Sequence, residues 1–192
     1  MIEKYKHLFS FNSELNEKLA GKPFYEYVKP VTFEELNLFE KKYDIMLPKD
    51  FKLFYSETNG LSTRRGFSVA FPFKDSSSNE TYFELEGLDP ISMNGSLSTL
   101  IDPNYYPEME PYPESEHEER KISEKIKNYL TLTHNSQGTY LLMGIGSLNC
   151  GHMYIWDHHY YVFEGDVEYP LKIAESFTEF LDGIVPLSSL DI

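Results

Sequence analysis

Residues 31–60 constrain the fold of this chain more than any other segment, because they carry start and end signals for two consecutive helices. Thr32 is a typical helix N-cap, and Glu35 stands where its side chain can complete a capping box. Pro48 suits the first position of a second helix, and Asn59-Gly60 is a typical helix end, because both residues tolerate a left-handed backbone. The segment therefore predicts a helical hairpin over residues 32–59.

Apolar spacing supports both helices of this hairpin. The residues that recur at helical spacing are Leu36, Phe39 and Tyr43 in the first helix, and Phe51, Phe54, Tyr55 and Thr58 in the second. Val31 and Leu36 occupy the two positions of a hydrophobic staple, and the first helix should end near Asp44. An irregular helix is also predicted for residues 1–20, with a break at residues 21–23.

After Gly60 the apolar pattern changes from helical spacing to alternation. Short strands are predicted at residues 67–71, 81–85, 139–145, 153–156 and 160–163. Residues 86–116 are rich in Gly, Pro, Asn and Ser, so a long loop or insertion is expected there. Ser176 and Glu179 form another capping-box pair, which predicts a last helix. This order predicts the α+β fold class, with the helical hairpin and the C-terminal helix packed on a mainly antiparallel sheet.

Composition limits the domain count and the kinds of partner. The chain has 192 residues, and its 15 Tyr and 14 Phe supply a core for a single domain over residues 1–192. Its 17 Lys and Arg stand against 31 Asp and Glu, which gives a net charge of −14. Such a surface repels nucleic acids and anionic membranes and attracts a basic protein. The alternative is that the acidity only keeps the protein in solution.

Other sequence features indicate the cytoplasm. The N-terminal residues are charged throughout and do not form a signal peptide, and no apolar run is long enough to cross a membrane. Cys150 is the only cysteine, so neither an internal disulfide nor a cysteine-based zinc site can form.

The candidate catalytic and metal-binding residues carry weak signals. His152, Asp157, His158 and His159 are close in sequence but match no spacing of known metal ligands. Cys150 has a nearby histidine but no flanking hydrolase motif. The sequence around Gly144-Ile145-Gly146 lacks the lysine and the following helix of a phosphate loop. We therefore expect a protein that is not an enzyme, with no catalytic residues, no cofactor and no metal.

Acidic clusters in polar loops are the candidate surface for a protein partner. These residues are Glu114, Glu116, Glu118 and Glu119 in one loop, Asp157 in a turn, and Glu164, Asp166 and Glu168 in another loop. Their carboxylates can attract a basic partner, although simple solvation accounts for them equally well.

Two segments together resemble the SUKH superfamily, the Smi/Knr-type domain. One runs from Thr32 through the Leu47-Pro48 turn to Asn59-Gly60, and the other is the sequence IAESFTEFL at residues 173–181. Trp156 and residues 161–163 fall where the family has strands. The resemblance covers roughly residues 25–185, and residues 86–120 depart from it as a long, proline-rich insertion.

The resemblance implies an α+β fold without enzymatic activity. Many bacterial members look like immunity proteins that neutralise polymorphic or contact-delivered toxins, often nucleases. We therefore expect an immunity protein, or antitoxin, whose partner is a basic toxin domain. The alternative is a regulatory scaffold of the same fold, like the fungal branch of the family, and a hydrolase that uses Cys150 is a third hypothesis. The sequence leaves open whether the protein is a monomer or a homodimer.

Overall fold

The computed structural model describes residues 1–11, 29–64, 67–75, 77–89, 91, 128–136, 138–157 and 170–190.

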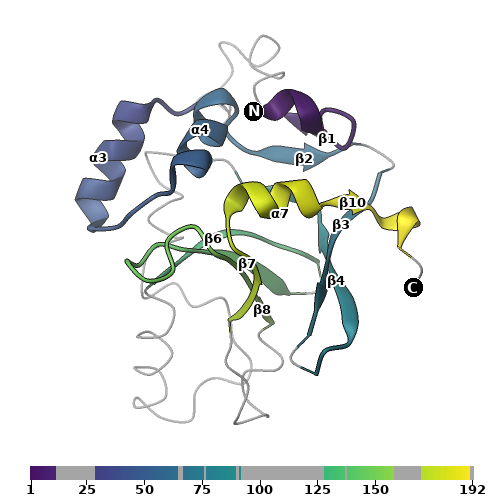
Figure 1. Ribbon diagram of the computed structural model, residues 1–192. Coiled ribbons are helices and arrows are strands. Elements are labelled where there is room, and N and C mark those ends of the chain that lie inside the picture. Colours follow the sequence, from purple (N-terminus) through teal and green to yellow (C-terminus); the bar gives the residue numbers. More distant parts are fainter. Residues whose placement is uncertain are drawn as a thin grey trace.

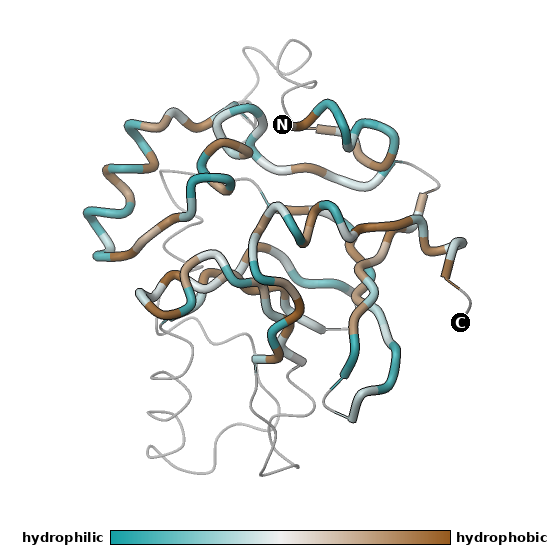
Figure 2. The backbone as a smooth tube through the Cα atoms, viewed as in Figure 1, coloured by the Kyte–Doolittle hydropathy of each residue, from teal (hydrophilic) through white to brown (hydrophobic). Residues whose placement is uncertain are grey.

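The helical hairpin forms as its local signals predict. Helix α3 (Phe33–Tyr43) begins at a complete capping box, in which Thr32 Oγ1 accepts from the Glu35 amide and the Glu35 carboxylate accepts from the Thr32 amide. It ends at Asp44, which adopts a left-handed backbone with φ of 53°. Helix α4 (Lys49–Glu57) follows, with Pro48 as its N-cap and not as its first residue. In Figure 2 the tube of α3 alternates between hydrophilic and hydrophobic residues, as an amphipathic helix should.

The end of α4 differs in detail from the prediction. Gly60 has the expected positive φ of 90°, but Asn59 does not. The helix stops at Glu57 and is followed by Thr58 in an extended conformation. The side chain of Asn59 is buried and forms two hydrogen bonds with the backbone of Ile91. Its Nδ2 donates to the Ile91 carbonyl and its Oδ1 accepts from the Ile91 amide, both at 2.6 Å.

The helix predicted for residues 1–20 is wrong over residues 1–11. A short 3-10 helix, η1 (Ile2–Tyr5), is followed by strand β1 (Phe9–Phe11). Phe9 and Phe11 lie on the same side of this strand and both are buried, which a strand achieves with a period of two. Residues 12–20 lie outside the described residues.

The described strands form antiparallel sheets (Figure 1). Their bounds are β2 (Leu61–Thr63), β3 (Val69–Lys74), β4 (Glu80–Leu85), β5 (Gly87–Leu88), β6 (Tyr129–His134), β7 (Thr139–Gly144), β8 (Met153–Asp157), β9 (Leu171–Ala174) and β10 (Val185–Pro186). The strand orders are β1-β2-β5, β10-β3-β4 and β6-β7-β8-β9. Four predicted strands correspond to β3, β4, β7 and β8, and the fifth, at 160–163, lies outside the described residues.

Part of the predicted insertion belongs to the sheets. Gly87 and Leu88 form β5, which pairs with β2, and Ile91 is buried in the core. Residues 92–127, which include the rest of that segment, lie outside the described residues.

Helix α7 (Phe177–Gly183) joins the hairpin to the sheets, and Figure 1 shows it between α4 and β3. Its Phe177 ring packs edge-on against Phe51 and Phe54 of α4, while its Phe180 ring stacks on Phe71 of β3. Ser176 caps the helix by accepting from the Glu179 amide. The Glu179 carboxylate reaches back one residue further than in a standard capping box, to the amide of Glu175. A short 3-10 helix, η3 (Leu187–Ser189), follows β10.

One cluster of buried apolar residues extends from Tyr5 to Ile184 and includes side chains of α3, α4 and α7. Leu36 and Phe39 enter it from α3, and Phe177 and Phe180 enter it from α7. The α+β fold class predicted from the sequence is therefore confirmed.

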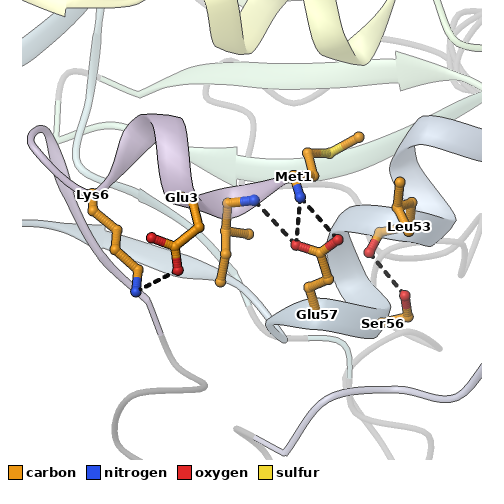
Figure 3. Close-up of polar contacts among 7 residues, drawn as sticks. Met1, Glu3, Lys6, Leu53, Ser56 and Glu57 are labelled. Carbon is orange, nitrogen blue, oxygen red and sulfur yellow. Dashed lines mark hydrogen bonds and ion pairs between the residues drawn. The ribbon is translucent and has the colours of Figure 1, made fainter.

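The amino group of Met1 holds the end of α4 (Figure 3). It lies 2.8 and 3.0 Å from the two carboxylate oxygens of Glu57, and the amide of Ile2 donates to the same carboxylate at 3.1 Å. This hydrogen-bonded cation holds the pKa of the Glu57 carboxyl below its ordinary value. The contact ties the first residues of the chain to the helical hairpin.

Glu57→Gln is expected to lower the free energy of unfolding at neutral pH by about 0.5–1 kcal/mol, because the pair is only partly buried. The folded-state pKa is depressed, so the stabilisation is present above the unfolded pKa and is lost as the pH falls through the folded one. Urea unfolding of wild type and Glu57→Gln from neutral pH down to about pH 3 checks this. The difference between their free energies of unfolding should vanish below about pH 4. A difference in free energy of unfolding that stays constant with pH would contradict the ion pair between Glu57 and the Met1 amino group.

Candidate partner-binding site

Two loops that are far apart in sequence meet at one end of the molecule. We call them the loop platform: residues 44–48, between α3 and α4, and residues 145–151, between β7 and β8. The amide of Met46 donates to the carbonyl of Ile145 at 3.3 Å, and Cys150 Sγ lies 3.5 Å from the carbonyl oxygen of Met46. Gly151 packs against Pro48 with a positive φ of 85°, a conformation that favours glycine. In Figure 1 the second loop lies beneath the α3–α4 linker.

Glu40 of α3 fixes the first loop of the platform, and Asp50 of α4 binds the start of α7. One oxygen of Glu40 accepts from the amide of Leu47 at 2.7 Å, and the other lies 2.9 Å from Lys52 Nζ. Asp50 accepts from both the amide and the hydroxyl of Thr178 at 2.9 Å, which ties α4 to the start of α7. The Glu40 carboxylate therefore holds the Leu-Pro turn from α3, while Asp50 connects α4 to α7.

Asn149 fixes the second loop. Its side-chain Oδ1 accepts from the backbone amide of Gly146 at 2.9 Å. The backbone amide of Asn149 donates to the carbonyl of Gly146 at 3.2 Å. The amide of His152 donates to the carbonyl of Asn149, and the amide of Ile145 donates to the carbonyl of Asn128. These bonds define the backbone of the turn at both of its ends.

The platform presents apolar side chains to solvent. Leu148 is 95% exposed and Met46 is 53% exposed, whereas most large apolar residues of the described chain lie in the core. The sequence did not lead us to either residue. The available signal was an apolar Leu148 within a turn of Gly, Ser and Asn, where a polar residue is usual.

Comparison with known protein families identifies the domain. The SMI1 / KNR4 family model (SUKH-1) matches residues 30–183, a span that includes the hairpin, the loop platform and α7. The chain belongs to the SMI1 / KNR4 family (SUKH-1). No curated protein and no solved structure matches the chain.

In this SUKH-1 domain the start of α4 and the start of α7 are in contact. Asp50, two residues after Pro48, binds Thr178 within the closing motif. The two segments that carry the resemblance in the sequence are thus in direct contact in the fold.

Cys150 lies in surroundings that suppress thiolate formation. Burial raises the pKa of the thiol, and the carboxylates of Glu40 and Asp50 raise it further, against a smaller opposing effect of Lys52. His152 lies with its Nε2 3.5 Å from a Glu175 oxygen and its Nδ1 3.5 Å from the Tyr154 hydroxyl. A catalytic cysteine needs a lowered pKa and a base at its sulfur. The geometry therefore does not support the hydrolase hypothesis.

The Gly144-Ile145-Gly146 segment has no amides to offer a phosphate. The amide of Gly144 donates to the carbonyl of His152, that of Ile145 to Asn128, and that of Gly146 to Asn149. All three donors are used within the fold, as a glycine turn between strands requires.

Metal binding is not supported by the part of the chain that the structure describes. Within those residues, no group of three or more His, Cys, Asp or Glu side chains is placed to hold a metal ion. His158 and His159, two of the weighed ligands, lie outside the described residues, as does the side chain of Asp157.

The acidic clusters predicted as partner contacts also fall outside the description. These residues are Glu114, Glu116, Glu118, Glu119, Glu164, Asp166 and Glu168. The backbone of Asp157 ends β8 and pairs with Thr139. Among the described residues, no helix is long and apolar enough to span a bilayer.

Cys150→Ala is expected to leave the free energy of unfolding nearly unchanged, because the thiol makes only one long hydrogen-bond contact in the described structure. In the wild-type protein the thiol should react slowly with iodoacetamide near neutral pH. The alkylation rate measured against pH should give a midpoint above that of a cysteine in an unstructured peptide, since the pKa is raised. A midpoint below that of the peptide would restore the nucleophile hypothesis.

Proposed function

We propose that this SUKH-1 protein is an immunity protein that binds a toxin domain and blocks its activity. Membership of the family over residues 30–183 carries the proposal, because the resemblance implies toxin neutralisation for many bacterial members. The raised pKa of the Cys150 thiol does not favour a nucleophile. The amides of the glycine turn are hydrogen-bonded within the fold, and both features agree with a binding role. The action is stoichiometric: one immunity protein covers one toxin domain.

The target that fits the charge is a basic nuclease. A protein that binds phosphates presents cations, and the net charge of −14 attracts such a surface over long range. The acidic loops, with Glu114, Glu116, Glu118 and Glu119 in one and Glu164, Asp166 and Glu168 in the other, are our proposed contacts for this attraction. The complex forms in the cytoplasm, where a nuclease finds its substrate.

Co-expression with each protein encoded by the genes that adjoin its own, as candidate toxins, tests this function. Cells that express the toxin alone should stop growing, and cells that also express the immunity protein should grow. The purified pair should form a complex without nuclease activity, and its association rate should fall with added salt, as expected for opposite charges. A matched control is an unrelated acidic protein of similar size. No rescue and no complex would overturn the proposal in favour of the regulatory scaffold.

A further inference from the structure

The dipeptide Asn59-Gly60 is a sequence that deamidates readily when the chain is flexible. The backbone nitrogen that follows the asparagine attacks the side-chain carbonyl carbon, and a C–N bond forms. The proton of that backbone amide passes through solvent to the side-chain nitrogen, which leaves as ammonia, and a five-membered succinimide remains. Water then opens the ring to aspartate or to isoaspartate. Glycine in the second position speeds the attack, because it has no Cβ to obstruct the approach.

Both reacting groups are held by hydrogen bonds in the fold. The Gly60 amide donates to the carbonyl of Thr58 at 3.0 Å. The Asn59 side chain is bonded to the backbone of Ile91 through both its Nδ2 and its Oδ1, at 2.6 Å each. Ring closure requires the side chain to leave Ile91 and the amide to leave Thr58. Asn59 is also only 1% exposed, so solvent has little access to carry the proton. The folded chain therefore suppresses this reaction.

Neither product can restore these hydrogen bonds. In aspartate a carboxylate oxygen replaces the Nδ2 donor, so the Ile91 carbonyl faces an acceptor. In isoaspartate the side-chain carbons become part of the main chain, which lengthens the link between α4 and β2. Leu61 follows Gly60 directly and is paired with both Phe11 and Leu88, so a longer link disturbs the register of the β1-β2-β5 sheet. Deamidation is therefore incompatible with the native contacts of this segment.

We infer that Asn59-Gly60 is a deamidation site that reacts only in the unfolded chain and whose products destabilise the native fold. The co-reactant is water, and ammonia is released. The inference goes beyond the proposed function and does not depend on it. Each period in the unfolded state leaves a fraction of chains that unfold more readily than before, so unfolding becomes progressively irreversible. A partner that binds only the folded state slows this loss, because it lowers the unfolded fraction.

Peptide mapping by mass spectrometry tests the protection of Asn59. Wild-type protein is incubated in a warm, mildly alkaline buffer, with and without denaturing urea, beside a synthetic peptide of residues 55–64. In urea Asn59 should deamidate as fast as Asn94, which is also followed by glycine and serves as the internal reference. Without urea it should react at least about 100-fold more slowly than in the peptide, since a domain of ordinary stability is unfolded for a far smaller fraction of the time. Equal rates in folded protein and peptide would overturn the inference.

A urea series separates global unfolding from local opening. The deamidation rate at Asn59 should rise in proportion to the unfolded fraction, which the fluorescence of Trp156, the only tryptophan, measures in parallel. A rate above that proportion before the unfolding transition would mean that the end of α4 opens locally, and reaction only in the unfolded chain would then be wrong. Gly60→Ala is the control in full urea, where folding plays no part. It should slow deamidation at Asn59 several-fold and leave Asn94 unchanged, and an unchanged rate at Asn59 would contradict the succinimide route.

Refolding tests the effect of the products. Protein held in urea until part of its Asn59 has reacted is diluted to a urea concentration just below the wild-type midpoint. Size-exclusion chromatography then separates folded from unfolded chains, and each fraction is mapped. Deamidated Asn59 should be concentrated in the unfolded fraction, because the buried carbonyl of Ile91 has lost its donor. Equal proportions in the two fractions would show that the fold tolerates the products, and this part of the inference would fall.

Discussion

Gly144→Ala is expected to lower the free energy of unfolding by about 3 kcal/mol or more, as forced overpacking of a rigid site does. A Cβ at this position would lie 2.8 Å from the backbone carbonyl carbon of Asn149 and 2.7 Å from its Cγ, and closer still to its backbone oxygen. The turn cannot move away freely. The amide of Gly144 donates to the carbonyl of His152, and the amide of Gly151 donates to the carbonyl of Gly144, both at 2.9 Å.

Gly146→Ala is the matched control, two residues away in the same turn. A Cβ there would meet only the ends of side chains, Asn149 Oδ1 at 3.0 Å and Asn128 Oδ1 at 3.3 Å, which can shift slightly more easily than a backbone can. Its cost should stay near 1 kcal/mol or below, within the range of a mild steric change. Urea unfolding of both variants gives the comparison. Equal stabilities of the two variants would show that the turn adjusts its backbone, and a rigid platform would then be untenable.

The helical hairpin was predictable because its signals are local. The capping box of α3 joins Thr32 to Glu35 within one turn, so four consecutive residues contain the whole interaction. The same holds for Ser176, which caps α7 through Glu179. Where both partners of an interaction lie within a few residues of each other, the sequence pattern alone predicts the hydrogen bond between them.

The short strands could not be found in this way. Strand β1 pairs with β2 through Phe9 and Thr63, and β10 pairs with β3 through Val185 and Ala70. Strands of two or three residues have no periodicity of their own, and their existence depends on a partner far away in the chain. The wrong helix at residues 1–11 has this cause, because Phe9 and Phe11 form a strand through their pairing with Thr63 and Leu61 of β2.

The candidate site was missed for a related reason. Cys150, His152 and the glycines of the β7–β8 turn each lack, in the sequence, the neighbouring motif that their chemistry would need. The sequence does not show that the α3–α4 linker lies against that turn, because Met46 and Ile145, which form the connecting bond, are separated by about half of the 192-residue chain. Exposure of Leu148 becomes informative only when its surroundings are known.

Asn59→Ala is expected to lower the free energy of unfolding by about 3 kcal/mol, because it leaves the buried amide and carbonyl of Ile91 without this partner. Asn59 is 1% exposed, so water cannot take the place of its amide. The control is Asn79→Ala. The exposed Asn79 side chain donates to Asp75 at 3.1 Å, and its loss should cost less than about 1 kcal/mol.

Asn59→Asp adds a test with a definite sign. The new carboxyl can still accept from the Ile91 amide, but it can donate to the Ile91 carbonyl only when protonated. Burial and that carbonyl would hold its folded pKa above the unfolded value of about 3.9, so protons bind the folded state more tightly. Stability relative to wild type should therefore be greatest at low pH and fall as the pH rises through that folded pKa. Urea unfolding of Asn59→Asp and wild type from about pH 4 to pH 8 measures this. A difference in free energy of unfolding that does not change with pH would mean that the new carboxylate does not face the Ile91 carbonyl.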